Sequence, residues 1–92
     1  MPPDVRIRTD VKSLFGQRVR DFRSRLAISQ EELADRAGLD RTYVSSVERG
    51  HRNVSLENIV RLAMALGVDA GELMTGLGAA GAHSGGVPAT QR

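Results

Sequence analysis

The sequence predicts an all-α fold, a bundle of five short helices, and three observations support this fold class. Apolar residues recur every three or four positions, which is the spacing of helices with one buried face. Residues that favour the start of a helix, such as Ser29, Asp40 and Ser55, stand just before these periodic stretches. Glycines such as Gly38 and Gly67 follow the stretches, where helices commonly end. We therefore expect helices and no β-sheet.

The first helix is expected to begin at Ser13, because helical apolar spacing is clear from there onward. Its buried stripe comprises Phe15, Val19, Phe22 and Leu26. Residues 1–12 contain two prolines and alternating charges, which favour a position outside the core. We interpret this segment as a flexible basic arm, which is either a simple tail or an arm that contacts phosphates.

Two brief helices joined by a tight turn are expected within residues 30–49. Ser29 and Glu32 fit a capping box, in which each side chain accepts a hydrogen bond from a backbone N–H at the helix start. Gly38 is able to adopt the positive φ angle that a tight helix exit needs. Ala34 is small and allows the second helix of the pair to approach closely. This combination predicts a helix-turn-helix motif.

Two further helices are expected in the second half of the chain. One spans about residues 56–66, and its apolar residues are Leu56, Ile59, Val60, Ala63 and Leu66. A short one follows a second box-like start and carries Leu73 and Met74. Residues 76–92 are rich in glycine, alanine and serine, so we expect a disordered tail there. The folded domain is therefore predicted to span residues 13–75.

The composition argues against several classes of protein. The chain has 92 residues, enough for one small domain, and no cysteine for a disulfide or a thiolate metal site. His51 and His83 lack neighbours at metal-ligand spacing, so we expect no metal and no cofactor. No apolar run approaches the ~20 residues that span a bilayer, and no signal peptide is visible. We therefore expect a cytoplasmic protein without a membrane partner.

Neither the net charge nor the side-chain patterns alone identify a binding partner or a catalytic activity. Thirteen basic residues stand against eleven acidic ones, and this net charge of +2 is too slight to establish a nucleic-acid partner. No carboxylate pair, nucleophile–base set or phosphate-binding loop is present in the sequence, so we do not expect an enzyme.

Several motifs between residues 14 and 74 point to one family. They are Arg20 and Arg23, S-Q-E-E-L-A at 29–34, A-G-L at 37–39, V-E-R-G at 47–50 and L-A-M-A-L-G-V at 62–68. Through them this segment resembles the five-helix DNA-binding domain of the lambdoid phage repressor and Cro family, the xenobiotic-response-element type of bacterial regulator. The run R-T-Y-V-S-S-V-E-R-G-H-R-N-V-S-L at 41–56 resembles, within this family, the small controller proteins of restriction–modification systems.

The resemblance implies that the helix at residues 41–49 lies in the major groove of double-stranded DNA. The residues expected to read bases are Arg41, Thr42, Ser45 and Ser46. The guanidinium of Arg41 suits guanine O6 and N7, and the methyl group of Thr42 suits thymine. Contacts to the DNA backbone are expected from Gln30, Tyr43, Arg49, His51, Arg52 and Asn53. The alternative is that these are merely solvated residues of a helix and its loop.

The resemblance also implies a structural salt bridge and an oligomer. Arg23 and Glu48 match a family pair that forms a partly buried ion pair between the first and third helices. A homodimer is expected, because one small domain contacts too few base pairs for useful specificity. Its interface is expected at the end of the chain, although the same residues suit an ordinary core. They are Met64, Val68, Leu73, Met74 and Leu77.

Other partners remain as alternatives. The acidic patch of Glu31, Glu32 and Asp35 is either a solvated face or a contact for RNA polymerase, which some family members use. A different class of function is an antitoxin, which binds a toxin as well as DNA. A protein-interaction module that keeps the fold with little independent DNA binding is also considered. The sequence leaves the operator and the direction of regulation open.

Overall fold

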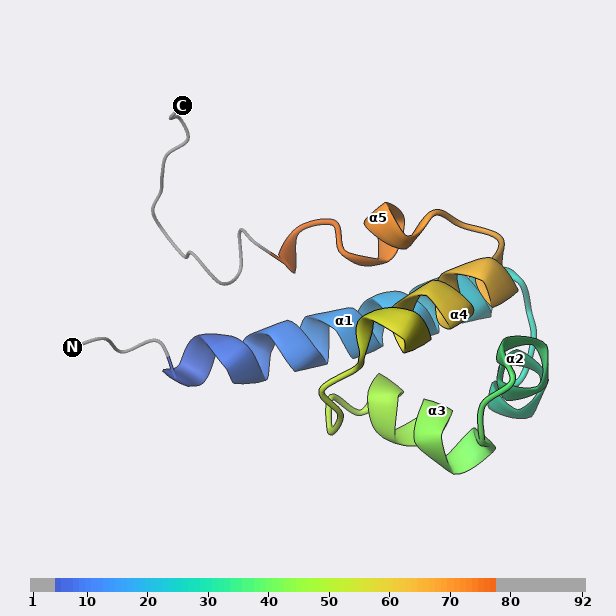
Figure 1. Cartoon of the computed structure of the whole chain (residues 1–92), viewed down its shortest axis with the longest axis horizontal. Helices are drawn as coiled ribbons and strands as arrows, with labels where there is room; N and C mark the ends of the chain where they lie inside the picture. The colour runs from blue at the N-terminus through green and yellow to red at the C-terminus, as the bar shows by residue number, and fades with distance from the viewer. Residues whose placement is uncertain (1–4, 78–92) are drawn as a thin grey trace.

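The computed structural model describes residues 5–77 and contains five helices within them (Figure 1). They are α1 (Val5–Arg25), α2 (Gln30–Ala37), α3 (Arg41–Glu48), α4 (Leu56–Leu66) and α5 (Ala70–Leu73). No strand is present in this part of the chain, so the predicted all-α class is confirmed.

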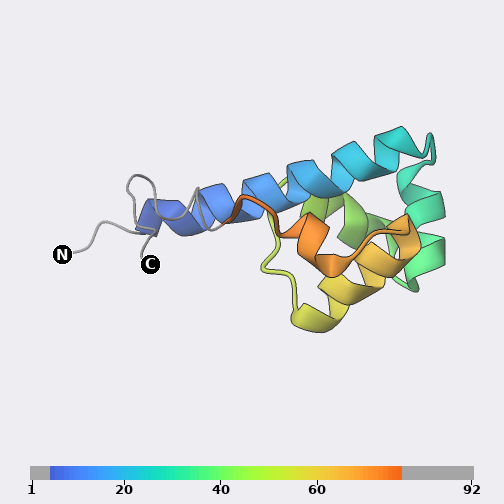
Figure 2. The same ribbon diagram turned by 90° about the horizontal axis from the view of Figure 1, so that it is seen from above.

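The long helix α1 contacts the shorter helices α3, α4 and α5. α3 packs against α1 and α2, and α4 packs against α2 and α5. Figure 1 shows α3 on one side of the bundle and α5 on the opposite side, with α1 and α4 between them. Seen from above, α1 extends beyond the shorter helices toward the N-terminus (Figure 2). This arrangement leaves one face of α3 free of other helices.

The core contains at least one fully buried side chain from each helix. Its most deeply buried members are Val19, Leu33, Val44, Val47, Leu62 and Leu73. Burial of each such side chain stabilises the fold by about 1.5–3 kcal/mol. The apolar residues expected to join the helix-turn-helix pair are therefore part of the common core of the domain.

The helix ends agree only in part with the sequence-based expectations. Ser29 Oγ accepts a hydrogen bond from the backbone N–H of Glu32 at 3.0 Å. The carboxylate of Glu32 does not return to the backbone of Ser29 but accepts from Arg36 Nε at 3.0 Å. Gly38 has a φ angle of 70°, as the tight turn requires. Asp40 occupies the N-cap position of α3, but its side chain makes no capping hydrogen bond.

Two expected boundaries of the domain differ in the structure. α1 begins at Val5 rather than Ser13, so residues 5–12 belong to a helix and not to an arm. Val11 packs on the core one turn before Phe15, so the apolar stripe of α1 begins before the expected start of the helix at Ser13. At the other end Leu77 is buried, so the packed region passes the expected limit at residue 75. The remainder of the expected arm and tail, 1–4 and 78–92, lies outside the described residues.

α1 and α3 approach each other closely at Gly16. A Cβ atom at this position would lie 2.2 Å from the backbone oxygen of Val47 and 2.9 Å from that of Glu48. Only a residue without a side chain allows this distance between the two helices. The end of α3 is therefore fixed directly against the backbone of α1.

Candidate nucleic-acid interface

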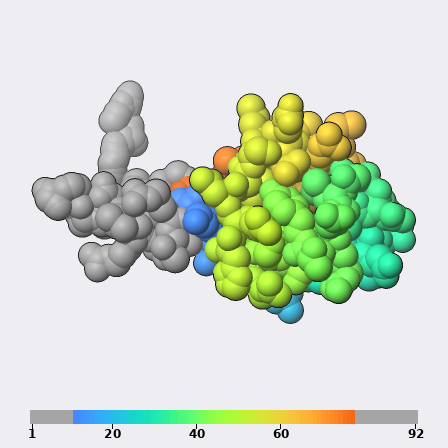
Figure 3. Space-filling model, turned by 60° about the horizontal axis from the view of Figure 1, so that its bottom comes forward, coloured from blue at the N-terminus to red at the C-terminus, as the bar shows by residue number. Residues whose placement is uncertain are grey.

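The free face of the helix-turn-helix is formed by α3 and the loop that follows it. Figure 3 brings this face forward and shows α3 and the loop beside α2. Arg41, Thr42, Arg49 and Arg52 are exposed, while Tyr43 is half-buried. The three arginines give the face a basic character that the net charge of the whole chain hides.

The N-terminal turn of α3 presents the residues that are best suited to contact bases. Arg41 and Thr42 are exposed, and within the described residues their side chains form no hydrogen bond or ion pair. Ser45 lies one turn further along and is half-buried. Its hydroxyl oxygen accepts a hydrogen bond from Arg49 Nη1 at 2.9 Å. Arg41, Ser45 and Arg49 therefore follow one another at i, i+4 and i+8 on the same side of the helix.

Ser46 does not belong to this exposed side, so its expected role in base reading is contradicted. Its side chain is turned inward, and only 8% of the residue is exposed. Ser46 Oγ donates a hydrogen bond to the backbone oxygen of Tyr43 at 3.0 Å. It also accepts one from Arg52 Nε at 3.0 Å. The reason is helical geometry, because Ser46 lies one turn after Tyr43 and shares the side of α3 on which Tyr43 contacts α4.

Tyr43 and Arg52 form a second layer of contacts beside Ser46. The Arg52 guanidinium carbon lies 5.3 Å from the centre of the Tyr43 ring, within the range of a cation–π contact. The Tyr43 hydroxyl oxygen accepts a hydrogen bond from Asn58 Nδ2 of α4 at 3.1 Å. Sequence reasoning missed Asn58, because no periodicity joins a residue in α4 to one in α3. Asn53 and His51 are exposed in the same loop.

An ion pair fixes α3 to α1 beneath this surface. Arg23 Nε lies 2.6 Å from Glu48 Oε2, and Arg23 Nη2 lies 2.9 Å from Glu48 Oε1. The side chains are only 16% and 4% exposed, so the pair is largely shielded from water. The hydrogen bonding of Arg23 to the Glu48 carboxylate, which accepts, is the main cause that raises the pKa of Arg23, while burial opposes this rise. Arg23 also donates through Nη1 to the backbone oxygen of Ile28 at 3.0 Å.

Gln30 also contacts the ion pair of Arg23 and Glu48 and is not fully exposed to solvent. Its Nε2 donates to Glu48 Oε1 at 3.0 Å, and the residue is half-buried. One of the two N–H groups of this amide is therefore occupied, and the other remains available to a further acceptor. The first turn of α2 is thus tied to the end of α3 by a single carboxylate.

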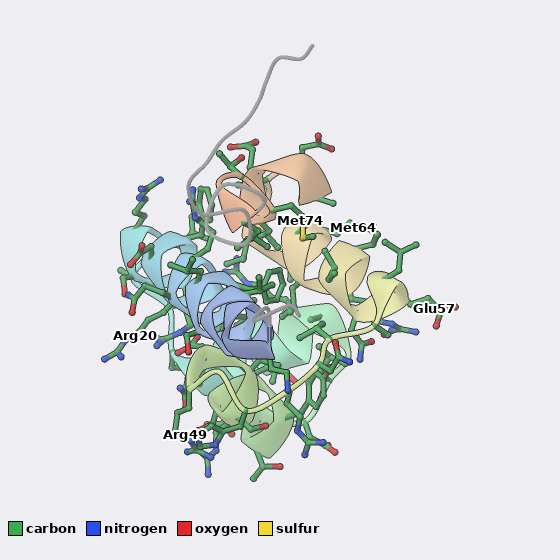
Figure 4. All side chains as sticks on the ribbon, turned by 90° about the vertical axis from the view of Figure 1, so that its left-hand side faces the viewer. Arg20, Arg49, Glu57, Met64 and Met74 are labelled. Atoms are coloured by element: carbon green, nitrogen blue, oxygen red, sulfur yellow. The ribbon has the colours of Figure 1, made fainter. Side chains whose placement is uncertain are left out.

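The residues expected at a dimer interface separate into two groups. Leu73 and Leu77 are 0% and 8% exposed, so they belong to the core and their assignment to an interface is wrong. Met64 and Met74 are 76% and 42% exposed, and Val68 is half-buried. Figure 4 shows both methionines on the α4–α5 side of the molecule, whereas Arg49 projects from α3 on the opposite side.

Sequence reasoning missed two exposed apolar residues on α4. Leu56 is 76% exposed and Val60 is 41% exposed, although helical periodicity assigned both to the buried face. Together with Met64 they stand at i, i+4 and i+8, which places them along one side of α4. The buried residues Ile59, Leu62, Ala63 and Leu66 lie on the other side of that helix. α4 is therefore apolar on more of its surface than the bundle covers.

The remaining features suggest no separate chemical site. A cavity of about 160 Å³ lies between α1 and the α3–α4 loop, and Lys12 and Arg52 are among its lining residues. This volume is smaller than the ~300–1,000 Å³ typical of small-molecule sites. A wider hollow of about 420 Å³ beside Leu56, Glu57, Val60 and Arg61 is shallow and open to solvent. Over residues 5–77, no three histidine or acidic residues are grouped as metal ligands would be. In the same region, no helix is long and apolar enough to cross a membrane.

Comparison with known proteins relates this geometry to DNA-binding regulators. A family model described as a helix-turn-helix matches residues 19–73, which are more than half of the chain. The control protein C.BamHI of Bacillus amyloliquefaciens is 50% identical over 66 residues, which cover 71% of this chain and 82% of that protein. The control protein C.SmaI of Serratia marcescens is 44% identical, over 72% of this chain and 79% of that protein.

A solved structure supports the same relationship. The restriction–modification controller protein C.AhdI from Aeromonas hydrophila is 55% identical and superposes with a TM-score of 0.67. The match covers 70% of this chain and 96% of that one. The resemblance that the sequence motifs indicated is therefore confirmed, both in sequence and in three dimensions.

Proposed function

The chain belongs to the Cro/C1-type helix-turn-helix family of sequence-specific DNA-binding transcriptional regulators, and from this premise we propose that it binds its operator as a homodimer with α3 in the major groove. The observation that supports this mode best is the exposed side of α3. Arg41 and Thr42 are exposed at the start of α3. Arg49 is exposed at its C-terminal end, and Arg52 is exposed in the loop that follows. Base-reading groups are thus flanked by cations that suit phosphates.

We assign separate roles to the residues of this face. Arg41, Thr42 and Ser45 read base edges, because they lie on the exposed side of α3. The DNA backbone is contacted by Gln30, Tyr43, Arg49, His51, Arg52 and Asn53. The ion pair of Arg23 and Glu48 holds α3 in place without touching DNA. Ser46 is removed from the base-reading set because its side chain is buried.

We propose that two copies pair through the exposed apolar side of α4 and the residues that flank α5. This surface comprises Leu56, Val60, Met64, Val68 and Met74. Met64 and Met74 lie on the side opposite Arg49 (Figure 4), so pairing through them would leave both α3 helices free. Two copies would then contact half-sites about 34–36 Å apart, one turn of the DNA helix.

The relatives suggest a biological setting. C.BamHI, C.SmaI and C.AhdI are named as control or controller proteins, the last of a restriction–modification system. We propose that this chain likewise regulates genes of a restriction–modification system, acting in the cytoplasm where its DNA target would lie. Contacts with RNA polymerase or a toxin are not needed for this proposal.

Selection of DNA from a random duplex pool tests the proposal. The full chain is expected to enrich an inverted repeat with half-site centres one helical turn apart, and to bind the same sequence in its own upstream region. A matched duplex with one half-site inverted controls for spacing and charge. Equal binding to selected and random duplexes at moderate salt would contradict the proposal and favour an interaction module. In that case the Arg41 face would have no sequence-reading role.

A further inference from the structure

Arg52 is exposed, yet its guanidinium group is already held before any ligand is present. Its Nε donates to Ser46 Oγ at 3.0 Å, and its guanidinium carbon lies over the Tyr43 ring, 5.3 Å from the centroid. Arginine side chains in loops normally sample many rotamers, and ordering them on binding reduces affinity. An arginine that is held in advance loses less of this freedom.

The groups that hold Arg52 are themselves fixed. Ser46 Oγ donates to the backbone oxygen of Tyr43 at 3.0 Å, so its lone pairs are directed toward Arg52. The Tyr43 hydroxyl accepts from Asn58 Nδ2 at 3.1 Å, which connects the ring to the start of α4. Two helices therefore support a single loop arginine.

The contacts made by Arg52 also determine which of its donors remain free. The N–H of Nε is occupied by Ser46, and the guanidinium group is in cation–π contact with Tyr43. The edge formed by Nη1 and Nη2 is left, and its parallel donors match two oxygens of one phosphate group. Ser46 selects this edge, because its oxygen occupies the alternative one.

We propose that Ser46 is a positioning residue that presets Arg52 to grip a phosphate of the DNA backbone, with Tyr43 as the supporting platform. This inference rests on the proposed DNA-binding function and adds to it a role for a buried side chain. Ser46 acts only through Arg52 and touches no nucleic acid. The two residues must therefore be coupled energetically in DNA binding.

A double-mutant cycle with Ser46→Ala and Arg52→Ala tests the coupling. Affinity for the selected operator is measured by fluorescence anisotropy at several salt concentrations. Ser46→Ala is expected to weaken binding by about 2- to 10-fold, the loss that one net hydrogen bond predicts. In the Arg52→Ala background the same change is expected to have almost no effect. Arg52→Ala should also reduce the salt slope by about one.

Ser45→Ala provides the matched control, because it removes a neighbouring hydroxyl that pairs with Arg49 and not with Arg52. Its effect should be the same with or without Arg52. Thermal melting checks that each variant is folded, and Ser46→Cys replaces Ser46→Ala if the alanine variant is not. In the free protein, NMR should show a slowly exchanging Arg52 Nε–H that is lost in either Ser46 variant.

The outcomes separate the two proposals. Independent effects of Ser46→Ala and Arg52→Ala, or an unchanged Arg52 Nε–H signal in the Ser46 variants, would overturn the positioning role while DNA binding stands. If Arg52→Ala relaxed the preference at one base position instead of weakening all sequences equally, the phosphate assignment would be overturned. A native chain that binds no duplex selectively would overturn the proposed function itself and this inference with it.

Discussion

Replacement of Glu48 by glutamine is expected to destabilise the domain strongly, although the side-chain volume hardly changes. Glu48 accepts hydrogen bonds from Arg23 Nε and Nη2 and from Gln30 Nε2. The Glu48→Gln variant retains one carbonyl oxygen for these three donors and no charge. The side chain of Arg23 is only 16% exposed, so its positive charge is then unpaired and largely shielded from solvent.

The magnitude follows from the burial of the two partners. Removal of one member of a buried ion pair costs ~3–5 kcal/mol. Arg23 keeps its hydrogen bond to the backbone oxygen of Ile28 and some contact with water, so we expect the lower end, about 3 kcal/mol. A domain of about 70 residues has a total stability of roughly 4–11 kcal/mol. The substitution therefore removes a large share of it.

Thermal and urea unfolding followed by circular dichroism measure this change. In a domain of this size 1 kcal/mol shifts Tm by ~4–8 °C, so Glu48→Gln should lower Tm by about 12–24 °C. Glu32→Gln is the matched control, because its pair with Arg36 is 50% and 44% exposed. An exposed i, i+4 pair is worth only ~0.3–0.5 kcal/mol, so Tm should fall by a few degrees at most.

The pH dependence provides a second check on the same ion pair. The pKa of Arg23 is raised from an already high value by its hydrogen bond to Glu48. A raised pKa on a cation gives stability that is present below the unfolded-state pKa and is lost only as pH rises through the folded-state pKa. Both values lie far above neutrality, so the effect of Glu48→Gln should be constant between about pH 6 and 9. Equal Tm losses in Glu48→Gln and Glu32→Gln would refute the reasoning.

Three further predictions concern the DNA face, the dimer and the close contact of α1 with α3. Arg41→Ala should weaken operator binding by ~1–3 kcal/mol and relax one base preference; an unchanged selected site at constant salt would exclude it as a base reader. Met64→Glu should give a monomer in sedimentation at micromolar concentration with unchanged helicity in circular dichroism, and a persistent dimer would place the interface elsewhere. Gly16→Ala should cost ~1–3 kcal/mol in urea unfolding, because its Cβ would lie 2.2 Å from the Val47 backbone oxygen; unchanged stability would mean that α1 shifts freely.

Much of the fold follows from local sequence signals, but its ends do not. Ser29 and Gly38 mark the limits of α2 through capping and a positive φ angle, which are local properties of the chain. The sequence places the start of α1 too late, because the prolines and alternating charges of residues 1–12 outweigh Val11, whose role becomes evident only when it packs on the core. Leu77 follows a glycine in a tail-like composition, and its burial depends on a contact with the assembled bundle.

In the candidate site, too, local sequence signals predict some side-chain positions and not others. The positions of Arg41 and Thr42 on an exposed turn follow from periodicity together with the family motif. The inward direction of Ser46 does not, because a serine beside Val47 suits either side of the boundary between core and surface. Its hydrogen bonds to Arg52 and Tyr43 arise from the path of the loop after α3, which local spacing does not specify.

The geometry of α3 explains why so few residues remain to read sequence. Val44 and Val47 are committed to the core, and Tyr43 and Ser46 are engaged by α4 and the loop. The exposed side therefore consists of Arg41, Thr42, Ser45 and Arg49, and Arg49 is paired with the Ser45 hydroxyl. Because a serine distinguishes bases weakly, we expect Arg41 and Thr42 to supply most of the discrimination within one half-site. So few base-reading residues favour the proposed pairing of two copies, for which the unburied apolar side of α4 is the surface that we propose.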